Sequence, residues 1–273
     1  MERLRALGYE PVLSPHALDS GPLYYAGRRE DRVADLHAAF ADPSIDGVIC
    51  TRGGWGSAEL LPHLDAELIR SNRKAFIGYS DLTSFQSWLQ NECGLMSFYG
   101  PMVAADFARE DGAHLDSWMS SLHGDGAWSL GAADGLRILR AGEAEGPLLG
   151  GCLSILNASL GTPYAAKTAG SVLFLEDIGT KPYQWDRMLV HLRYAGGLED
   201  VTGIVFGDMK QCVPPEEEEY LERAILHSLR DFDGPIGIGL RCGHVSAPNI
   251  TLPLGQRVKL ALGAGDVRLS FLE

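Results

Sequence analysis

The feature that most constrains the fold is an apolar strand followed by a turn and a helix, repeated within the first hundred residues. The runs IDGVICT (45–51) and KAFIGYS (74–80) are short and mostly apolar, and each leads into an amphipathic segment. Such strands are covered on both faces, and their alternation with helices predicts a parallel sheet wound on both sides. A helix is predicted at 30–41, where apolar residues recur every three or four positions, and a short strand at 9–13.

The alternation stops near Gly100, which divides the chain into three parts. We predict an N-terminal domain over 1–100, a connector over 101–148 that is rich in Gly, Asp and Ala clusters, and a C-terminal domain over 149–273. The last part contains strong strands, two helices and an alternating C-terminal end typical of hairpin strands. The predicted fold class is therefore α/β, with a doubly wound parallel-sheet N-terminal domain and a β-rich α+β C-terminal domain.

Charge and composition exclude several classes of protein. The 273 residues include 23 basic and 36 acidic side chains, a net charge of −13, without a local basic patch, so nucleic acid is not a predicted partner. The sequence contains no run of about 18 apolar residues, so no membrane span is predicted. The charged start MERLRALGYE and five scattered cysteines without a CxxC pair predict a cytoplasmic protein with reduced thiols.

The sharpest local motif is Gly78-Tyr79-Ser80-Asp81, which lies between a buried strand and an amphipathic helix. A serine on such a tight turn exposes its hydroxyl and directs the first N–H groups of the helix toward a developing oxyanion. The motif differs from the G-x-S-x-G nucleophile elbow because Leu82 replaces the second glycine. The structural alternative is a Ser or Asp N-cap, which is common in strand-to-helix turns.

Two other candidates are a carboxylate and a histidine farther along the chain. Glu176 ends the buried run SVLFLE, where a carboxylate can orient a histidine. His244 follows a glycine in a turn and can serve as a base near neutral pH. An ordinary strand-end cap and a surface histidine are the structural alternatives. With Ser80, these residues allow a serine hydrolase with the chain order Ser, Glu, His.

Nucleotide and metal sites are less well supported. The glycine loop TRGGWG (51–56) allows close approach to a ligand, but it lacks the Lys-Ser/Thr of a P-loop and the spacing of GxGxxG, so a plain turn is equally consistent. No cluster has the multiple-ligand spacing of a zinc site, and no nicotinamide fingerprint is present. We therefore predict neither a metal nor a cofactor.

Six segments in register carry a family resemblance. They are RGGWGSAELLPHLD, IGYSDLTSF, FYGPMV, GGCLSILNASLGTPY, LFLEDIGTKPYQWDRML and GHVSAPNITLPLG. In this order they resemble the LD-carboxypeptidase family of serine peptidases, which includes murein tetrapeptide L,D-carboxypeptidases and microcin C self-immunity peptidases. The resemblance extends from about residue 3 to the C-terminus.

The resemblance implies a triad of Ser80, Glu176 and His244, and an oxyanion hole formed by the backbone N–H groups of Gly54 and Asp81. It also implies a site between the two domains, a homodimer, and a cytoplasmic enzyme without a metal. The implied reaction releases D-alanine from murein tetrapeptide through an acyl-enzyme. A microcin-C-type peptidase acting on peptidyl or aminoacyl nucleotides is one alternative, and a catalytically silent peptide-binding homologue is another.

Several residues bear on these alternatives. Members of the family usually begin with a strand before the first helix of this chain, and that strand is expected to be missing here. Tyr99 stands where many members have histidine, and Cys152 stands where asparagine is common; either change is expected to alter substrate binding. The connector contains only Trp118 and Trp128, which disfavours the aromatic loop of the nucleotide-cleaving branch. Trp185 is expected to pack in the core.

Overall fold

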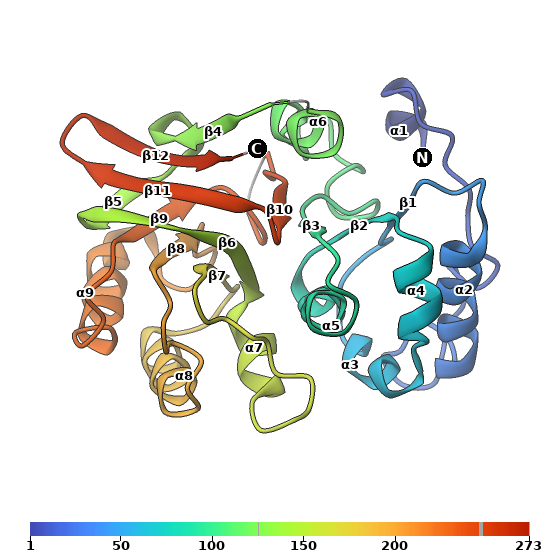
Figure 1. Ribbon diagram of the computed structural model, residues 1–273, viewed down its shortest axis with the longest axis horizontal. Helices are drawn as coiled ribbons and strands as arrows, with labels where there is room; N and C mark the ends of the chain where they lie inside the picture. The colour runs from blue at the N-terminus through green and yellow to red at the C-terminus, as the bar shows by residue number, and fades with distance from the viewer. Residues whose placement is uncertain (125, 246–247, 273) are drawn as a thin grey trace.

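The computed structural model describes residues 1–124, 126–245 and 248–272, which form two sheets lying side by side (Figure 1). The first sheet has four strands in the order β1-β2-β3-β10. Its strands are β1 (Gly47–Ile49), β2 (Ala75–Gly78), β3 (Ser97–Tyr99) and β10 (Leu252–Leu254). The first three are parallel, and β10 runs antiparallel to β3. The last strand of this sheet therefore comes from the C-terminal part of the chain.

Short helices surround the four-stranded sheet in Figure 1. They are α1 (Glu2–Ala6), α2 (Arg29–Ala41), α3 (Ser57–Leu60), η1 (Leu61–His63), α4 (Ala66–Ser71), η2 (Ser80–Leu82), α5 (Thr83–Trp88) and η3 (Leu89–Cys93). The predicted helix at 30–41 corresponds to α2. The segments η2, α5 and η3 form one continuous helical stretch directly after Tyr79.

The second sheet has eight strands in the order β4-β12-β11-β6-β7-β8-β9-β5. Its strands are β4 (Trp128–Gly131), β5 (Arg137–Arg140), β6 (Gly142–Cys152), β7 (Val172–Glu176), β8 (Gly203–Gly207), β9 (Ile236–Leu240), β11 (Arg257–Gly263) and β12 (Asp266–Phe271). Strands β6 to β9 are parallel, whereas the outer strands pair antiparallel.

Helices α7, α8 and α9 lie along one side of the eight-stranded sheet (Figure 1). The other helical segments of this half are η4 (Ala132–Asp134), η5 (Pro215–Glu217) and those three helices, α7 (Leu153–Ser159), α8 (Pro182–Tyr194) and α9 (Glu218–Ser228), whereas Trp118 of α6 (Leu115–His123) packs with Ile77 and Phe98 of the four-stranded sheet. The predicted fold class, a parallel α/β part followed by a β-rich part, is confirmed. Among the described residues, no helix is long and apolar enough to cross a bilayer.

Two sequence-based expectations about local structure differ from the fold. Residues 9–13 are not a strand: Pro11 has no N–H to donate to a ladder, and Val12 and Leu13 are 73% and 48% exposed. The predicted connector at 101–148 contains β4, β5 and much of β6, so its later half belongs to the eight-stranded sheet. The boundaries of the two domains stay a prediction.

One apolar core joins the two sheets. Tyr99 at the end of β3 and Leu252 in β10 pack in the same buried cluster as Phe174 of β7 and Leu260 of β11. Burying each side chain of this size contributes about 1.5–3 kcal/mol. Because the cluster draws on both halves of the chain, the carboxyl ends of β2 and β3 are held beside the carboxyl end of β7.

Candidate active site

Ser80 lies on a sharp turn at the carboxyl end of β2. Its φ of 67° is in the left-handed region, and only four described non-glycine residues have a positive φ. This conformation is costly for a residue with a Cβ atom, and it is typical of a nucleophile elbow. The Ser80 side chain remains partly exposed, whereas Tyr79 and Asp81 on either side are buried. The fold therefore presents this hydroxyl at the edge of the sheet.

The glycine loop after β1 packs against the elbow. A Cβ atom added at Gly53 would lie 3.1 Å from Ser80 Cβ and 3.4 Å from Ser80 Oγ, so the loop backbone approaches the serine closely. The neighbouring Gly54 has a φ of 132°. The carboxylate of Asp81 accepts hydrogen bonds from the backbone N–H (2.8 Å) and hydroxyl (2.7 Å) of Ser57, which joins the elbow to the start of α3.

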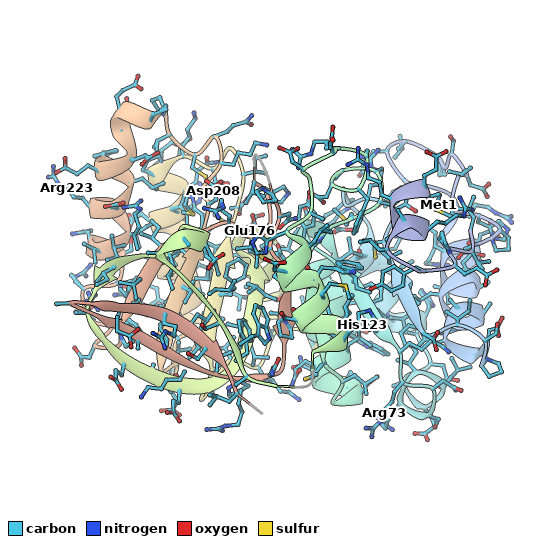
Figure 2. All side chains as sticks on the ribbon, turned by 90° about the horizontal axis from the view of Figure 1, so that it is seen from above. Met1, Arg73, His123, Glu176, Asp208 and Arg223 are labelled. Atoms are coloured by element: carbon cyan, nitrogen blue, oxygen red, sulfur yellow. The ribbon has the colours of Figure 1, made fainter. Side chains whose placement is uncertain are left out.

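Glu176 is the last residue of β7, and its side chain is fully buried. Three donors converge on its carboxylate. His244 donates through its backbone N–H (3.0 Å) and presents Nδ1 at 2.8 Å, both to Oε2, while the Tyr99 hydroxyl donates to Oε1 at 2.5 Å. A buried carboxylate needs such hydrogen-bond donors, because they offset the cost of removing its charge from water. In the labelled view of Figure 2, Glu176 lies near the middle of the molecule, between Arg223 at one end and Met1 at the other.

His244 lies in the turn that follows β9, and a glycine is required immediately before it. A Cβ atom on Gly243 would lie 2.5 Å from Glu176 Cδ, and the φ of Gly243 is 94°. The Gly243 N–H donates to Asn249 Oδ1 at 3.0 Å, which fixes the turn. The Tyr79 ring meets the imidazole edge to face at 5.2 Å. The glycine therefore allows the carboxylate and the imidazole to meet.

The electrostatics of this pair favour a basic imidazole. Burial disfavours the charged form of His244, but the hydrogen bond and the negative charge of Glu176 outweigh it, so the pKa of His244 is raised above its usual value. Because Nδ1 faces the carboxylate, the ring proton belongs on Nδ1 and Nε2 keeps its lone pair. Such a histidine can accept a proton from a hydroxyl and later return it.

The hydroxyl of Tyr99 was not assigned to the site from the sequence. It donates to Glu176 and accepts a hydrogen bond from the Ser80 backbone N–H at 3.1 Å, so it joins two of the three predicted triad residues. Cys152 lies opposite Glu176 in the β6–β7 register, where burial raises the pKa of its thiol well above the usual value. Trp185 is fully buried against Phe206, as expected.

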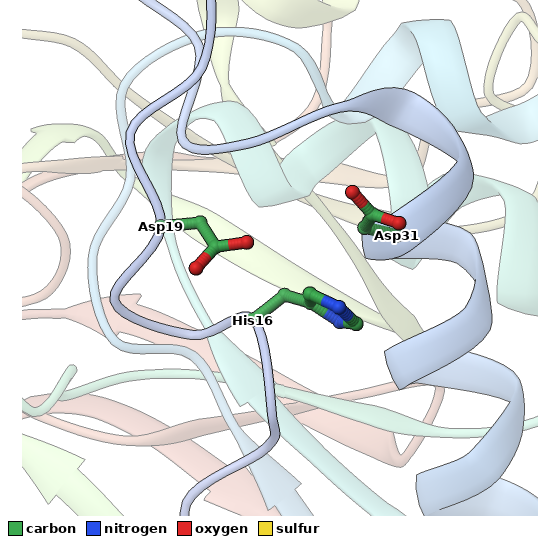
Figure 3. A group of neighbouring side chains, drawn as sticks. All are labelled: His16, Asp19 and Asp31. Carbon is green, nitrogen blue, oxygen red and sulfur yellow. The ribbon is translucent and has the colours of Figure 1, made fainter.

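A separate polar group lies outside this site. His16, Asp19 and Asp31 bring ligand-type atoms within 4.8 Å of one another (Figure 3). The sequence spacing gave no sign of this group. His16 Nδ1 lies 2.8 Å from Asp35 Oδ1, and this hydrogen bond raises the pKa of His16. Asp31 in turn pairs with Arg28 at 2.7 Å, so ion pairs with residues outside the group engage two of its three members.

The fold and the site define an α/β protein in which a buried glutamate pairs with a histidine, and the Tyr99 hydroxyl links this glutamate to the backbone of a strained serine where two sheets join. Residues 1–100 match the N-terminal domain of LD-carboxypeptidases, and residues 145–260 match their C-terminal domain. The chain belongs to the LD-carboxypeptidase family, which confirms the resemblance found in the sequence.

Individual relatives agree with this assignment. A probable murein peptide carboxypeptidase of Bacillus subtilis strain 168 is 36% identical, over 94% of this chain and 81% of the relative. The crystal structure of muramoyltetrapeptide carboxypeptidase from Oxalobacter formigenes has a TM-score of 0.85 and 30% identity, covering 100% of this chain and 92% of that one. An MccF-like protein from Bacillus anthracis strain Ames has a TM-score of 0.90 and 28% identity, covering 99% and 89%.

Proposed function

We propose that this protein is a serine peptidase that hydrolyses the bond between an L-centre and a C-terminal D-amino acid, releasing D-alanine from murein tetrapeptide. The observation that carries the proposal is the pairing of the buried Glu176 with His244 Nδ1 beside the strained Ser80 elbow. Two relatives named for murein peptides, from Bacillus subtilis and Oxalobacter formigenes, support the substrate class.

The mechanism follows from these groups. His244 Nε2 takes the Ser80 proton as Oγ forms a bond to the carbonyl carbon, and Glu176 stabilises the imidazolium. We assign stabilisation of the oxyanion to the backbone N–H groups of Gly54 and Asp81. The imidazolium then protonates the leaving nitrogen, the C–N bond breaks and D-alanine departs. A water molecule, deprotonated by His244, hydrolyses the acyl-enzyme and restores Ser80.

The proposal has two further parts. We place the protein in the cytoplasm, where recycled murein peptides are trimmed; its five unpaired cysteines support a reducing compartment. We also propose a homodimer, because the family resemblance implies one. Both parts are testable independently of the chemistry, by cell fractionation and by sedimentation of the purified chain.

One observation favours the second candidate, cleavage of an aminoacyl nucleotide. Trp55, in the glycine loop next to the elbow, is 48% exposed and is available to stack on a base. By contrast, the two tryptophans of the predicted connector are already packed. Trp118 is 2% exposed and packs against Phe107, and Trp128 stacks on Phe271. Both tryptophans of the predicted connector are therefore already engaged by aromatic neighbours, which supports the murein peptide as the first choice.

Stereochemistry provides the test of this proposal. The purified protein should release alanine from L-Ala-γ-D-Glu-meso-diaminopimelate-D-Ala at least about 100-fold faster than from the same peptide ending in L-alanine, since about 3 kcal/mol separates a fitted from a misfitted group. Amino-acid analysis measures both rates. Equal rates for the two peptides would overturn the proposal. Cleavage of neither peptide, together with release of aspartate from aspartyl sulfamoyl adenosine, would also overturn it; that compound is bound in a solved microcin C7 self-immunity protein.

A second prediction concerns pH. Imidazole must be neutral to accept the serine proton, so kcat/KM should fall as the pH drops through the pKa of His244. Because Glu176 raises that pKa, the acid limb should have its midpoint above the ordinary histidine value of 6.5. Measurement of kcat/KM between about pH 5 and 9 locates the midpoint. A midpoint at or below the ordinary value would show that Glu176 does not govern the base.

A further inference from the structure

Tyr99 occupies the point where the two sheets join. It is the last residue of β3, paired in register with Gly78 at the end of β2, and its side chain is fully buried. Its ring packs edge to face against Phe174, with centroids 5.6 Å apart, and against Tyr79 at 6.1 Å. These contacts hold the ring whether or not the hydroxyl is present. The function of the hydroxyl can therefore be separated from that of the ring.

The hydroxyl has a defined direction of hydrogen bonding. The Ser80 N–H can only donate, so at 3.1 Å the tyrosine oxygen accepts from it. The single hydroxyl proton then points to Glu176 Oε1 at 2.5 Å. Burial, reinforced by the charge of Glu176, raises the pKa of Tyr99 well above its usual value, so the proton remains in place. The hydroxyl is thus a permanent donor to the carboxylate.

Both hydrogen-bond partners of the Tyr99 hydroxyl, the Ser80 N–H and the Glu176 carboxylate, depend on it. Ser80 is the first residue of η2, where the N–H has no acceptor inside the helix, and its φ of 67° is strained. Glu176 accepts from both N–H groups of His244 at Oε2, and Nδ1 also lies 3.1 Å from Oε1, the oxygen to which the tyrosine donates. One hydroxyl therefore fixes the backbone that carries the nucleophile and withdraws negative charge from the group that orients the base.

We propose that Tyr99 is a positioning residue that couples the backbone of Ser80 to the carboxylate of Glu176, an inference that rests on the function proposed above. The hydroxyl does not touch the substrate. It sets the place from which Ser80 attacks and the strength with which Glu176 holds His244. A purely structural tyrosine would support the core without changing the pH dependence of the nucleophile.

The test uses Tyr99→Phe, with Tyr9→Phe as the matched control. The Tyr9 hydroxyl also has two partners: it accepts from Trp118 Nε1 at 2.8 Å and lies 2.6 Å from His123 Nε2, away from the site. Each variant thus loses one hydroxyl and two contacts. The readout is the rate at which a fluorophosphonate modifies Ser80, followed by mass spectrometry from pH 5 to 9, together with D-alanine release.

In Tyr99→Phe we expect the modification rate to fall by about 10- to 100-fold, as expected for loss of a hydrogen bond to a charged group. Glu176 loses a donor and pulls more strongly on the imidazolium, so the acid limb should move up by about half to one pH unit. The kcat for D-alanine release should fall in parallel, with KM changed less than about threefold. Tyr9→Phe should leave the limb in place.

The outcomes separate this inference from the proposed function. If the parent is modified at Ser80 but releases no D-alanine, the substrate is wrong, and the comparison of the two variants still decides the function of Tyr99. An unchanged rate and acid limb in Tyr99→Phe overturn the inference. A folded parent that resists modification overturns both. If Tyr99→Phe does not fold, 3-fluorotyrosine at position 99, a stronger donor, must shift the limb to lower pH, and no shift overturns the inference.

Discussion

Replacing Ser80 by alanine is expected to reduce kcat for D-alanine release by at least about 10⁴-fold, because removal of a serine nucleophile disables the whole triad. The fold should survive. Alanine and serine both carry a Cβ atom, so the strained φ of 67° is no worse in the variant, and within the described residues the Ser80 hydroxyl makes no hydrogen bond that the variant would lose. Thermal unfolding and D-alanine release, measured on the same preparation, give both quantities.

Ser228→Ala is the matched control for this experiment. Ser228 is buried in α9, where its hydroxyl donates to Asp186 Oδ1 at 2.7 Å, far along the chain from the site. Loss of the Ser228 hydroxyl should lower the free energy of unfolding by about 1 kcal/mol without changing kcat. If Ser80→Ala keeps more than about one per cent of the parent rate, the serine is not the nucleophile.

Changing Glu176 to glutamine should have the second largest effect. The side-chain amide replaces one acceptor oxygen by an NH2 donor, so this group faces either the donors of His244 at the Oε2 position or the Tyr99 hydroxyl at the Oε1 position. The imidazole then loses its preferred tautomer and its stabilising charge. By analogy with removal of the triad carboxylate in other serine peptidases, kcat/KM should fall by about 10³- to 10⁴-fold. The acid limb of the residual activity should move to lower pH.

The neighbouring Asp177 provides the control for this change. It is also a buried carboxylate, but it accepts from the backbone N–H groups of Ser154 (2.9 Å) and Ile178 (2.9 Å), and within the described residues it acts on His244 through its charge alone. Asp177→Asn should therefore lower the free energy of unfolding, while kcat/KM should fall less than about tenfold. Equal losses in the two variants would assign the effect to general damage at the end of β7.

Local sequence signals account for much of the fold. The runs that became β1, β2, β7 and β8 are mostly apolar and end at turns, so their existence could be predicted from neighbouring residues alone, although β1 is less buried than the sequence predicts. Strands β4 and β5 were missed because their stability comes from pairing with β12 and β9, far away in the sequence. Local propensity carries no information about such partners.

In the candidate site, too, local sequence identifies some residues, while others depend on partners far away in the chain. Ser80, Glu176 and His244 each stand at a recognisable strand end or glycine turn, so they could be proposed as candidates. Tyr99 could not be assigned its place, since its two hydrogen-bond partners are 19 and 77 positions away. The close approach of Gly53 to the serine was also unexpected, because the family resemblance implied Gly54, the next glycine of the same loop, as the oxyanion-hole residue. Tertiary packing determines both contacts.

The most direct test of the account is to locate the residue that a fluorophosphonate modifies. The parent, Ser80→Ala and Glu176→Gln are treated alike, digested, and mapped by peptide mass spectrometry. We predict a single adduct on Ser80 in the parent, none in Ser80→Ala, and much slower modification in Glu176→Gln. An adduct on another residue, or a folded parent that releases D-alanine while Ser80 stays unmodified, would contradict the assignment of Ser80 as the nucleophile.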